Sequence, residues 1–220
     1  PEFRGALAHA MRLVFLLTIP SAIGLSILAE PIIALIYEHG RFTAFSTAQT
    51  AAALRFYAFG LIGYSAVKVL APAFYALDKR NLPMFVSLFS IALNFCLNWI
   101  FTLHLGFGHR GLALSTSVVA VTNFILLYVM MRRYAGRLET GTLFSTMAKL
   151  LMAGAVLGVV CWLGNRFFFG GGMRASLVQK IVGVMTTVAA GGLAFFAAAY
   201  ALRVAELQDL VQVVRRRIAR

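Results

Sequence analysis

Charged residues are scarce in this sequence. Asp, Glu, Lys and Arg make up 12% of the 220 residues, whereas hydrophobic residues make up 61%. A soluble domain usually carries about 25% charged residues, and a chain of this size cannot hide so much apolar surface in one core. The composition therefore excludes an ordinary soluble domain and favours a chain whose outer surface lies in lipid.

Acidic residues are rarer still, with seven Asp and Glu against twenty Lys and Arg, a formal net charge of +13. None of the acids lies in the middle of an apolar run, so no carboxylate pair is placed for acid–base catalysis. Nucleotide-binding loops and the motifs of serine hydrolases and zinc proteases are also missing. We therefore expect no enzymatic activity and no cofactor. The basic residues flank apolar runs, as in membrane proteins, which argues against a nucleic-acid partner.

Cysteine is nearly absent. Cys96 and Cys161 both lie inside apolar runs, and neither belongs to a CxxC pair. The sequence therefore predicts no disulfide and no metal site, and the two thiols are expected to be small buried groups.

Six apolar segments can be distinguished by their length and polar flanks, and each is long enough to cross a bilayer. The segments cover residues 13–37, 50–77, 82–103, 111–131, 143–169 and 177–202. They predict an all-α integral membrane protein with about six transmembrane helices. Because the chain begins with Pro1 rather than methionine, we expect it to start inside a longer protein.

The orientation is predicted from the distribution of Lys and Arg, which concentrate on the cytoplasmic side of membrane proteins. Thirteen of them fall on the side of the N-terminus, here called side A, against six on the opposite side B, while Lys68 lies within a span. Side A is therefore expected to be cytoplasmic, with both ends of the chain on it. The basic C-terminal tail is expected to be drawn to anionic membrane lipids.

One narrow polar face is predicted on the second segment. Tyr57, Tyr64, Lys68 and Tyr75 are spaced by seven, four and seven residues, which places them on one side of a helix. A lysine inside a membrane span is costly and usually faces a cavity with an anionic partner. Lys68, Tyr64 and Tyr75 are therefore the candidate substrate-binding residues.

Two further segments carry polar residues. Asn94 and Asn98 share a sector of the third segment with several Ser and Thr, and Thr116 lies on one face of the fourth. Interhelical hydrogen bonding and a functional polar site explain the asparagines equally well. The fifth segment instead has Gly154 and Gly158, a GxxxG spacing suited to close helix packing.

Three prolines fall inside the apolar segments and are expected to interrupt their helices. They are Pro20, Pro31 and Pro72. Pro72 lies one turn after Lys68, so we predict hinges for alternating access at Pro72 and Pro20.

Several motifs between residues 10 and 133 resemble the MurJ/MviN family and occur in the same order as in that family. They are AEPI at 29–32, YEHGRFT at 37–43, YAFGL at 57–61, VKVLAPAFYA at 67–76 and GLALSTS at 111–117. The resemblance implies a MATE-like, inverted-repeat transporter of fourteen helices, of which this chain is similar to the C-terminal part. Residues 1–133 resemble helices nine to twelve of the C-lobe, and residues 134–220 resemble helices thirteen and fourteen with a basic cytoplasmic tail.

The resemblance also implies a function. Family members move lipid II, the undecaprenyl-diphosphate-linked peptidoglycan precursor, across the bacterial cytoplasmic membrane by alternating access. Lipid II, membrane lipids and an N-terminal lobe outside this sequence are then the expected partners. Helices thirteen and fourteen of the family form a groove for the long lipid tail, which suits the uniformly apolar fifth and sixth segments.

Some members of the family bind a sodium ion. The matching positions here are Asn94, Asn98 and Thr116, with the backbone carbonyl of Leu112. Asn98 stands where a sodium-binding member has an aspartate, and losing that charge weakens a site for a hard cation. Sodium and the membrane potential therefore both remain candidate driving forces.

Other functions stay open at this point. A related exporter of polysaccharide-linked lipids would have a similar sequence, whereas a MATE-type exporter of cationic drugs should show an acidic residue in its cavity. A membrane scaffold without transport activity would make Lys68 dispensable.

Overall fold

The computed structural model describes residues 2–38, 42–136, 140–169 and 177–208, and these ranges are almost entirely helical. The helices are α1 (Glu2–Ile27), α2 (Ala29–Tyr37), α3 (Ala44–Ala76), α4 (Asn81–Trp99), the π-helical turn η1 (Ile100–His104), α5 (His109–Ala135), α6 (Thr140–Phe169) and α7 (Leu177–Ala201). Within these ranges, six helices, counting α4 with η1 as one, are long and apolar enough to span a membrane. The predicted all-α membrane fold is confirmed.

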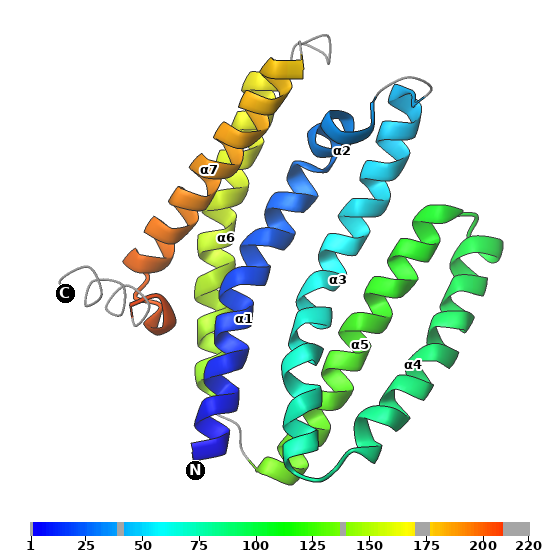
Figure 1. Ribbon diagram of the computed structural model, residues 1–220, viewed down its shortest axis with the longest axis vertical. Helices are drawn as coiled ribbons and strands as arrows, with labels where there is room; N and C mark the ends of the chain where they lie inside the picture. Colours follow the sequence, from blue (N-terminus) through cyan, green and yellow to red (C-terminus); the bar gives the residue numbers. More distant parts are fainter. Residues whose placement is uncertain (1, 39–41, 137–139, 170–176, 209–220) are drawn as a thin grey trace.

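The spans form a curved row rather than a closed bundle (Figure 1). α7 packs on α6, α6 on α1, α1 on α3, α3 on α5, and α5 on α4. α4 is the least covered, because α5 is its main neighbour, and most of its large apolar side chains are exposed. This open arrangement leaves one face of α3 and most of α4 without a cover from the described part of the chain.

The first predicted segment is divided into two helices. α1 ends at Ile27 and α2 begins at Ala29, with Leu28 between them. Pro31 explains the break, because it has no N–H to donate to the carbonyl of Ile27, four residues earlier. The expected interruptions at Pro20 and Pro72 are not seen, since α1 and α3 continue through both residues.

α3 and α5 are in direct backbone contact. A Cβ atom on Gly60 would lie 2.7 Å from the Cα of Ser117, and one on Gly63 would lie 2.8 Å from the carbonyl oxygen of Ala120. Ser117 Oγ also donates a hydrogen bond of 2.6 Å to the carbonyl of Phe56. In a membrane, where lipid competes equally for apolar surface, such close packing and interhelical hydrogen bonding hold helices together.

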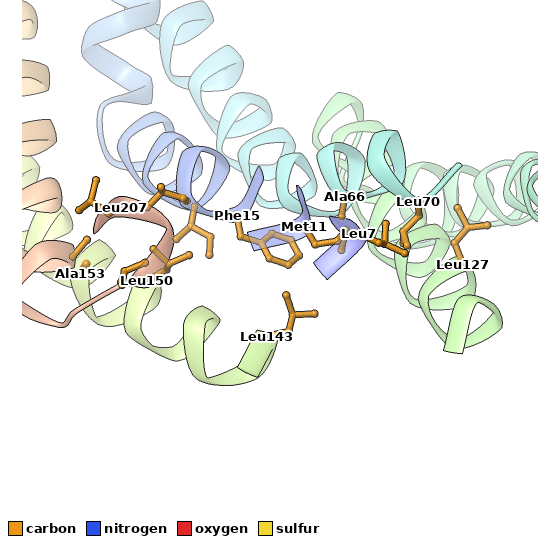
Figure 2. Packing of buried hydrophobic residues seen from close by; sticks show 14 of the residues in the cluster. Leu7, Met11, Phe15, Ala66, Leu70, Leu127, Leu143, Leu150, Ala153 and Leu207 are labelled. Carbon is orange, nitrogen blue, oxygen red and sulfur yellow. The ribbon is translucent and has the colours of Figure 1, made fainter. Parts of the chain in front are cut away.

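In the described residues, one apolar core cluster joins all six spans and the segment after α7. Phe15 and Met11 of α1 lie at its centre, with Leu70 of α3, Leu150 of α6 and Leu207 around them (Figure 2). α6 and α7 thus pack onto the rest of the chain mainly through α1, and α7 also contacts α2.

Candidate functional site

The face of α3 predicted to be polar is open. Tyr57, Tyr64 and Tyr75 are each about half exposed, and Lys68 is also exposed. The opposite faces of α3 contact α1 and α5. The four residues therefore lie on a surface that the described part of the chain does not cover.

Lys68 is held over an aromatic ring. Its Nζ lies 4.7 Å from the centroid of the Tyr64 ring, which is a cation–π contact. Tyr75 is seven residues further along, about 10 Å in a helix. The structure thus brings Lys68 and Tyr64 together and places Tyr75 two turns away on the same face.

Lys68 lies in the C-terminal half of α3. α3 has 33 residues and begins at Ala44 rather than at residue 50. Lys68 is therefore about 12 Å from the middle of the helix and about 12 Å from its C-terminal end. Its Cα therefore lies in the half of α3 nearer side A. Pro72 lies four residues later and cannot donate to the carbonyl of Lys68.

A neutral hydrogen-bond network joins α4 and α5. Asn98 Nδ2 donates to Asn94 Oδ1 at 2.9 Å, and Ser115 Oγ donates to Asn98 Oδ1. Thr116 Oγ1 donates to the carbonyl oxygen of Leu112 at 2.8 Å, and Ser115 Oγ lies 2.9 Å from that oxygen. The four residues of the predicted ion site are therefore adjacent, and Ser115, which the prediction left out, connects the two asparagines to the other helix.

These residues do not fit a sodium ion well. Hard cations prefer carboxylate and carbonyl oxygens, and neither α4 nor α5 contains an Asp or Glu. Asn94 Oδ1, Asn98 Oδ1 and the Leu112 carbonyl each already accept a hydrogen bond from within the network. The side-chain NH₂ of Asn98 donates to Asn94 Oδ1, and this hydrogen bond stands in for the positive charge that a cation would bring to the oxygen.

The two polar sets lie on different helices and are separated in this chain. α5 lies between α3 and α4 over most of their length (Figure 1), and α3 meets α4 chiefly near the turn that joins them. Lys68 is exposed on α3, whereas Asn94 and Asn98 are half-buried against α5. The described part of the chain therefore does not bring the two sets together.

An apolar groove runs between the α1–α2 pair and the α6–α7 pair. Its volume is about 450 Å³, and its lining includes Pro20 and Leu25 of α1, Ile32 of α2, Leu157 of α6, and Val188 and Phe196 of α7. Almost all of the side chains that line the groove are apolar. The α1–α2 break at Leu28 also borders this groove.

Three interhelical ion pairs were not anticipated from the sequence. Arg12 pairs with Glu206, Arg55 with Glu30, and Lys180 with Glu38. Arg55 also donates from Nε to the carbonyl of Ser26, at the end of α1. The partners are far apart in the sequence, so no local spacing could have paired them. In the structure, each of the three acids lies near an end of a helix.

The fold and these features define a helical membrane protein with several spans, an exposed cation on one span and an apolar groove. Residues 1–183 match the family model described as "Lipid II flippase MurJ". The match extends beyond residues 10–133, where the motifs lie, and includes α6. The chain belongs to the MurJ family of lipid II flippases.

Individual relatives agree with this assignment. The chain is 33% identical to the probable lipid II flippase MurJ of Rickettsia prowazekii (strain Madrid E), over 89% of this chain and 38% of the relative. It is 32% identical to the lipid II flippase MurJ of Burkholderia cenocepacia, over 90% of this chain and 37% of the relative. It thus spans a little over a third of the length of these relatives.

A solved structure has the same fold. The lipid II flippase MurJ in an inward closed conformation superposes with a TM-score of 0.68 at 22% identity. The match covers 89% of this chain and 39% of that structure.

Proposed function

We propose that this chain forms the C-terminal part of a lipid II flippase in the bacterial cytoplasmic membrane. Its family membership supports this function. The observation that locates a substrate-binding site is Lys68, an exposed cation on the uncovered face of a membrane span. The remaining wall of the transport path would come from the two thirds of a flippase that its relatives contain and this chain does not match.

Lys68 would balance the diphosphate of the substrate. Moving an unpaired diphosphate through an apolar barrier is prohibitive. An ammonium group offers a compact charge and three donors without demanding one geometry, so the headgroup can be held and then released. Its place in the side A half of α3 would put this contact on the cytoplasmic half of the path.

The apolar groove would hold the lipid chain. An undecaprenyl chain is a long hydrocarbon, and the groove between α1–α2 and α6–α7 is lined almost entirely by apolar side chains. Headgroup and tail would then use different parts of the chain: the polar face of α3 for the diphosphate, and the groove on the other side of α1 for the hydrocarbon.

A chimera tests the proposal. The corresponding C-terminal third of the Burkholderia cenocepacia relative is replaced by this chain, and the chimera is expressed in cells of that organism depleted of its own flippase. We expect growth to be restored. A chimera that reaches the membrane at normal levels and leaves lipid II on the cytoplasmic leaflet would contradict the proposed function.

The proposed orientation places side A, and both ends of the chain, in the cytoplasm. With Cys96 replaced by serine and Cys161 by alanine, a cysteine at exposed Phe45, at the side B end of α3, should react with a membrane-impermeant maleimide in intact spheroplasts. A cysteine at Arg80 should react only after lysis. Both positions are exposed, so labelling after lysis controls for reactivity. Labelling of position 80 in intact spheroplasts would mean that side A faces the outside and that the proposed orientation is wrong.

We further propose that the membrane potential, rather than sodium, drives transport. The closed network around Asn98 supports this, because its oxygens already have donors. The thermal unfolding midpoint in detergent should therefore be the same in NaCl and in KCl of equal concentration. Asn98→Asp supplies the missing charge and is the comparison variant: it should raise the midpoint in NaCl relative to KCl. A sodium-specific increase in the unaltered chain would show that the site binds the ion.

A further inference from the structure

The apolar groove has an ion pair beyond each of its ends. On α7, the groove is lined by Val188 and Phe196. Lys180 lies two turns before Val188 and pairs with Glu38 at the end of α2. Glu206 follows the end of α7 and pairs with Arg12 of α1. The two cations are equally buried, whereas the carboxylate is 3% exposed in Glu206 and 21% exposed in Glu38. The pairs also differ in geometry.

The pair on side A is a buried anchor. The side chains of Arg12 and Glu206 are 13% and 3% exposed, and Nε of the guanidinium is hydrogen-bonded to the carboxylate. The chain reverses at Arg203, whose carbonyl accepts a hydrogen bond from Lys149 of α6 at 3.4 Å. Leu207 is then buried against Leu150 in the core cluster (Figure 2). Removing one member of such a pair leaves an uncompensated buried charge, so this end of α7 is fixed to α1 and α6.

The pair on side B is looser. Lys180 Nζ lies 4.0 Å from Glu38 Oε2, which is beyond hydrogen-bonding distance. Oε2 is buried without a hydrogen-bond partner in both Glu38 and Glu206, but Oε1 of Glu206 accepts a hydrogen bond from Arg12. A shift of about 1 Å would close the contact into a hydrogen bond. Glu38 lies at the end of α2, and the break at Leu28 separates α2 from α1. A small tilt of α2 at this break would therefore make or break the contact without disturbing α1.

We propose that these two pairs position α7 differently: Arg12–Glu206 is a fixed anchor, and Lys180–Glu38 is a latch that sets the width of the apolar groove at its side B end. When the latch opens, α2 and the start of α7 separate and a long hydrocarbon chain enters the groove from the bilayer. The link to a lipid chain rests on the proposed function, whereas the latch itself is a property of α2 and α7.

Distances between spin labels test the latch directly, in the purified chain without Cys96 and Cys161. One label pair, at exposed Ile36 of α2 and Val182 of α7, reports the side B end. Lys180→Gln is expected to broaden that distance distribution toward longer values, and exchanging the charges with Glu38→Lys and Lys180→Glu together should restore it. An unchanged distribution in Lys180→Gln, or no restoration by the exchange, would overturn the latch.

A second label pair tests the anchor. Labels at His9 of α1 and Tyr200 of α7, both exposed, report the side A end. This distance should stay the same in Lys180→Gln and should broaden in Glu206→Gln. If Lys180→Gln broadens both ends equally, the two pairs do not act separately and the proposal is wrong.

Ligand binding tests the link to the groove. The probe is undecaprenyl phosphate, a polyprenyl chain with one phosphate, and the protein carries cysteines at positions 38 and 180. Closing them with a short bismaleimide should abolish probe binding, whereas blocking each thiol with a monofunctional maleimide should not. If the cross-linked and the blocked protein bind undecaprenyl phosphate equally, the lipid chain does not enter the groove between α2 and α7. If even the unaltered chain does not bind the probe, the groove's role in the proposed function fails, while the spin-label distances still decide the latch.

Discussion

Replacing Lys68 with alanine is expected to lower lipid II binding and flipping about ten- to a hundredfold in the chimera with the Burkholderia cenocepacia relative. A hydrogen bond to a charged group contributes about 1.5–3 kcal/mol, and each 1.4 kcal/mol changes an affinity tenfold. Lys68→Arg keeps the charge and should retain part of the activity, with altered geometry. Tyr64→Leu, which removes the ring under the ammonium, should have a smaller effect of the same sign.

A matched control is available in the same chain. Lys79 also lies over an aromatic ring, with Nζ 5.7 Å from the centroid of Tyr134, but it follows the end of α3 on side A. Lys79→Ala removes a similar charge and a similar contact outside the path, and it should leave lipid II binding unchanged. Equal losses in Lys68→Ala and Lys79→Ala would mean that general electrostatic attraction, rather than a site on α3, explains the effect.

The same measurement separates the competing functions. A scaffold without transport activity predicts normal growth with Lys68→Ala. If Lys68 only pairs with an acid of another lobe, lipid II binding should be unchanged while flipping is lost. The diphosphate role requires both to fall. The described parts of the spans bring no acid to the face of Lys68, Tyr64 and Tyr75, which does not match a cavity for cationic drugs.

The spans could be predicted from the sequence because a bilayer imposes a simple rule. Every backbone polar group in lipid must be satisfied within its own helix, so each apolar run of sufficient length becomes helical. The fate of the prolines could not be predicted in the same way. Pro31 coincides with a break, whereas the helices continue through Pro20 and Pro72, because neighbouring groups can satisfy the freed carbonyls.

The candidate site was only partly accessible to prediction. Periodicity correctly placed Tyr64 and Lys68 on one face, since residues four apart are neighbours on a helix. It could not show that Ser115 of α5 reaches Asn98 of α4, because no pattern within one helix specifies which face of another it meets. Likewise, Arg12 and Glu206 are 194 positions apart, and only the fold brings them together.

Close helix packing gives a clear example of the same limit. The GxxxG spacing of Gly154 and Gly158 predicted a tight contact, and both residues do face α1. A Cβ there would meet the flexible ends of Ile23 and Ile27. The backbone-to-backbone approach occurs instead at Gly60 and Gly63 of α3, whose spacing of three is not the usual motif.

Gly63→Ala is therefore expected to destabilise the fold by about 1–3 kcal/mol, the usual cost of overpacking. Its Cβ would lie 2.8 Å from the Ala120 carbonyl oxygen and 2.9 Å from the Val121 Cα, which are backbone atoms of α5. Neither can move away by rotating a side chain, so α3 and α5 would have to separate. Unfolding of the purified chain in detergent, monitored by helical circular dichroism, measures the change.

Gly192→Ala in α7 is the matched control, because a Cβ there would meet nothing within 4 Å. Alanine is favoured over glycine inside a helix by about 1 kcal/mol, so this variant should be neutral or slightly stabilised. The same preference applies at Gly63, where the steric clash must outweigh it. The expected result is therefore a destabilised Gly63→Ala and a Gly192→Ala that is neutral or slightly stabilised. A stabilising Gly63→Ala would mean that α3 and α5 are not in backbone contact. Because α3 carries Lys68, and α5 forms the network with Asn98, separating these helices should also reduce lipid II binding in the chimera.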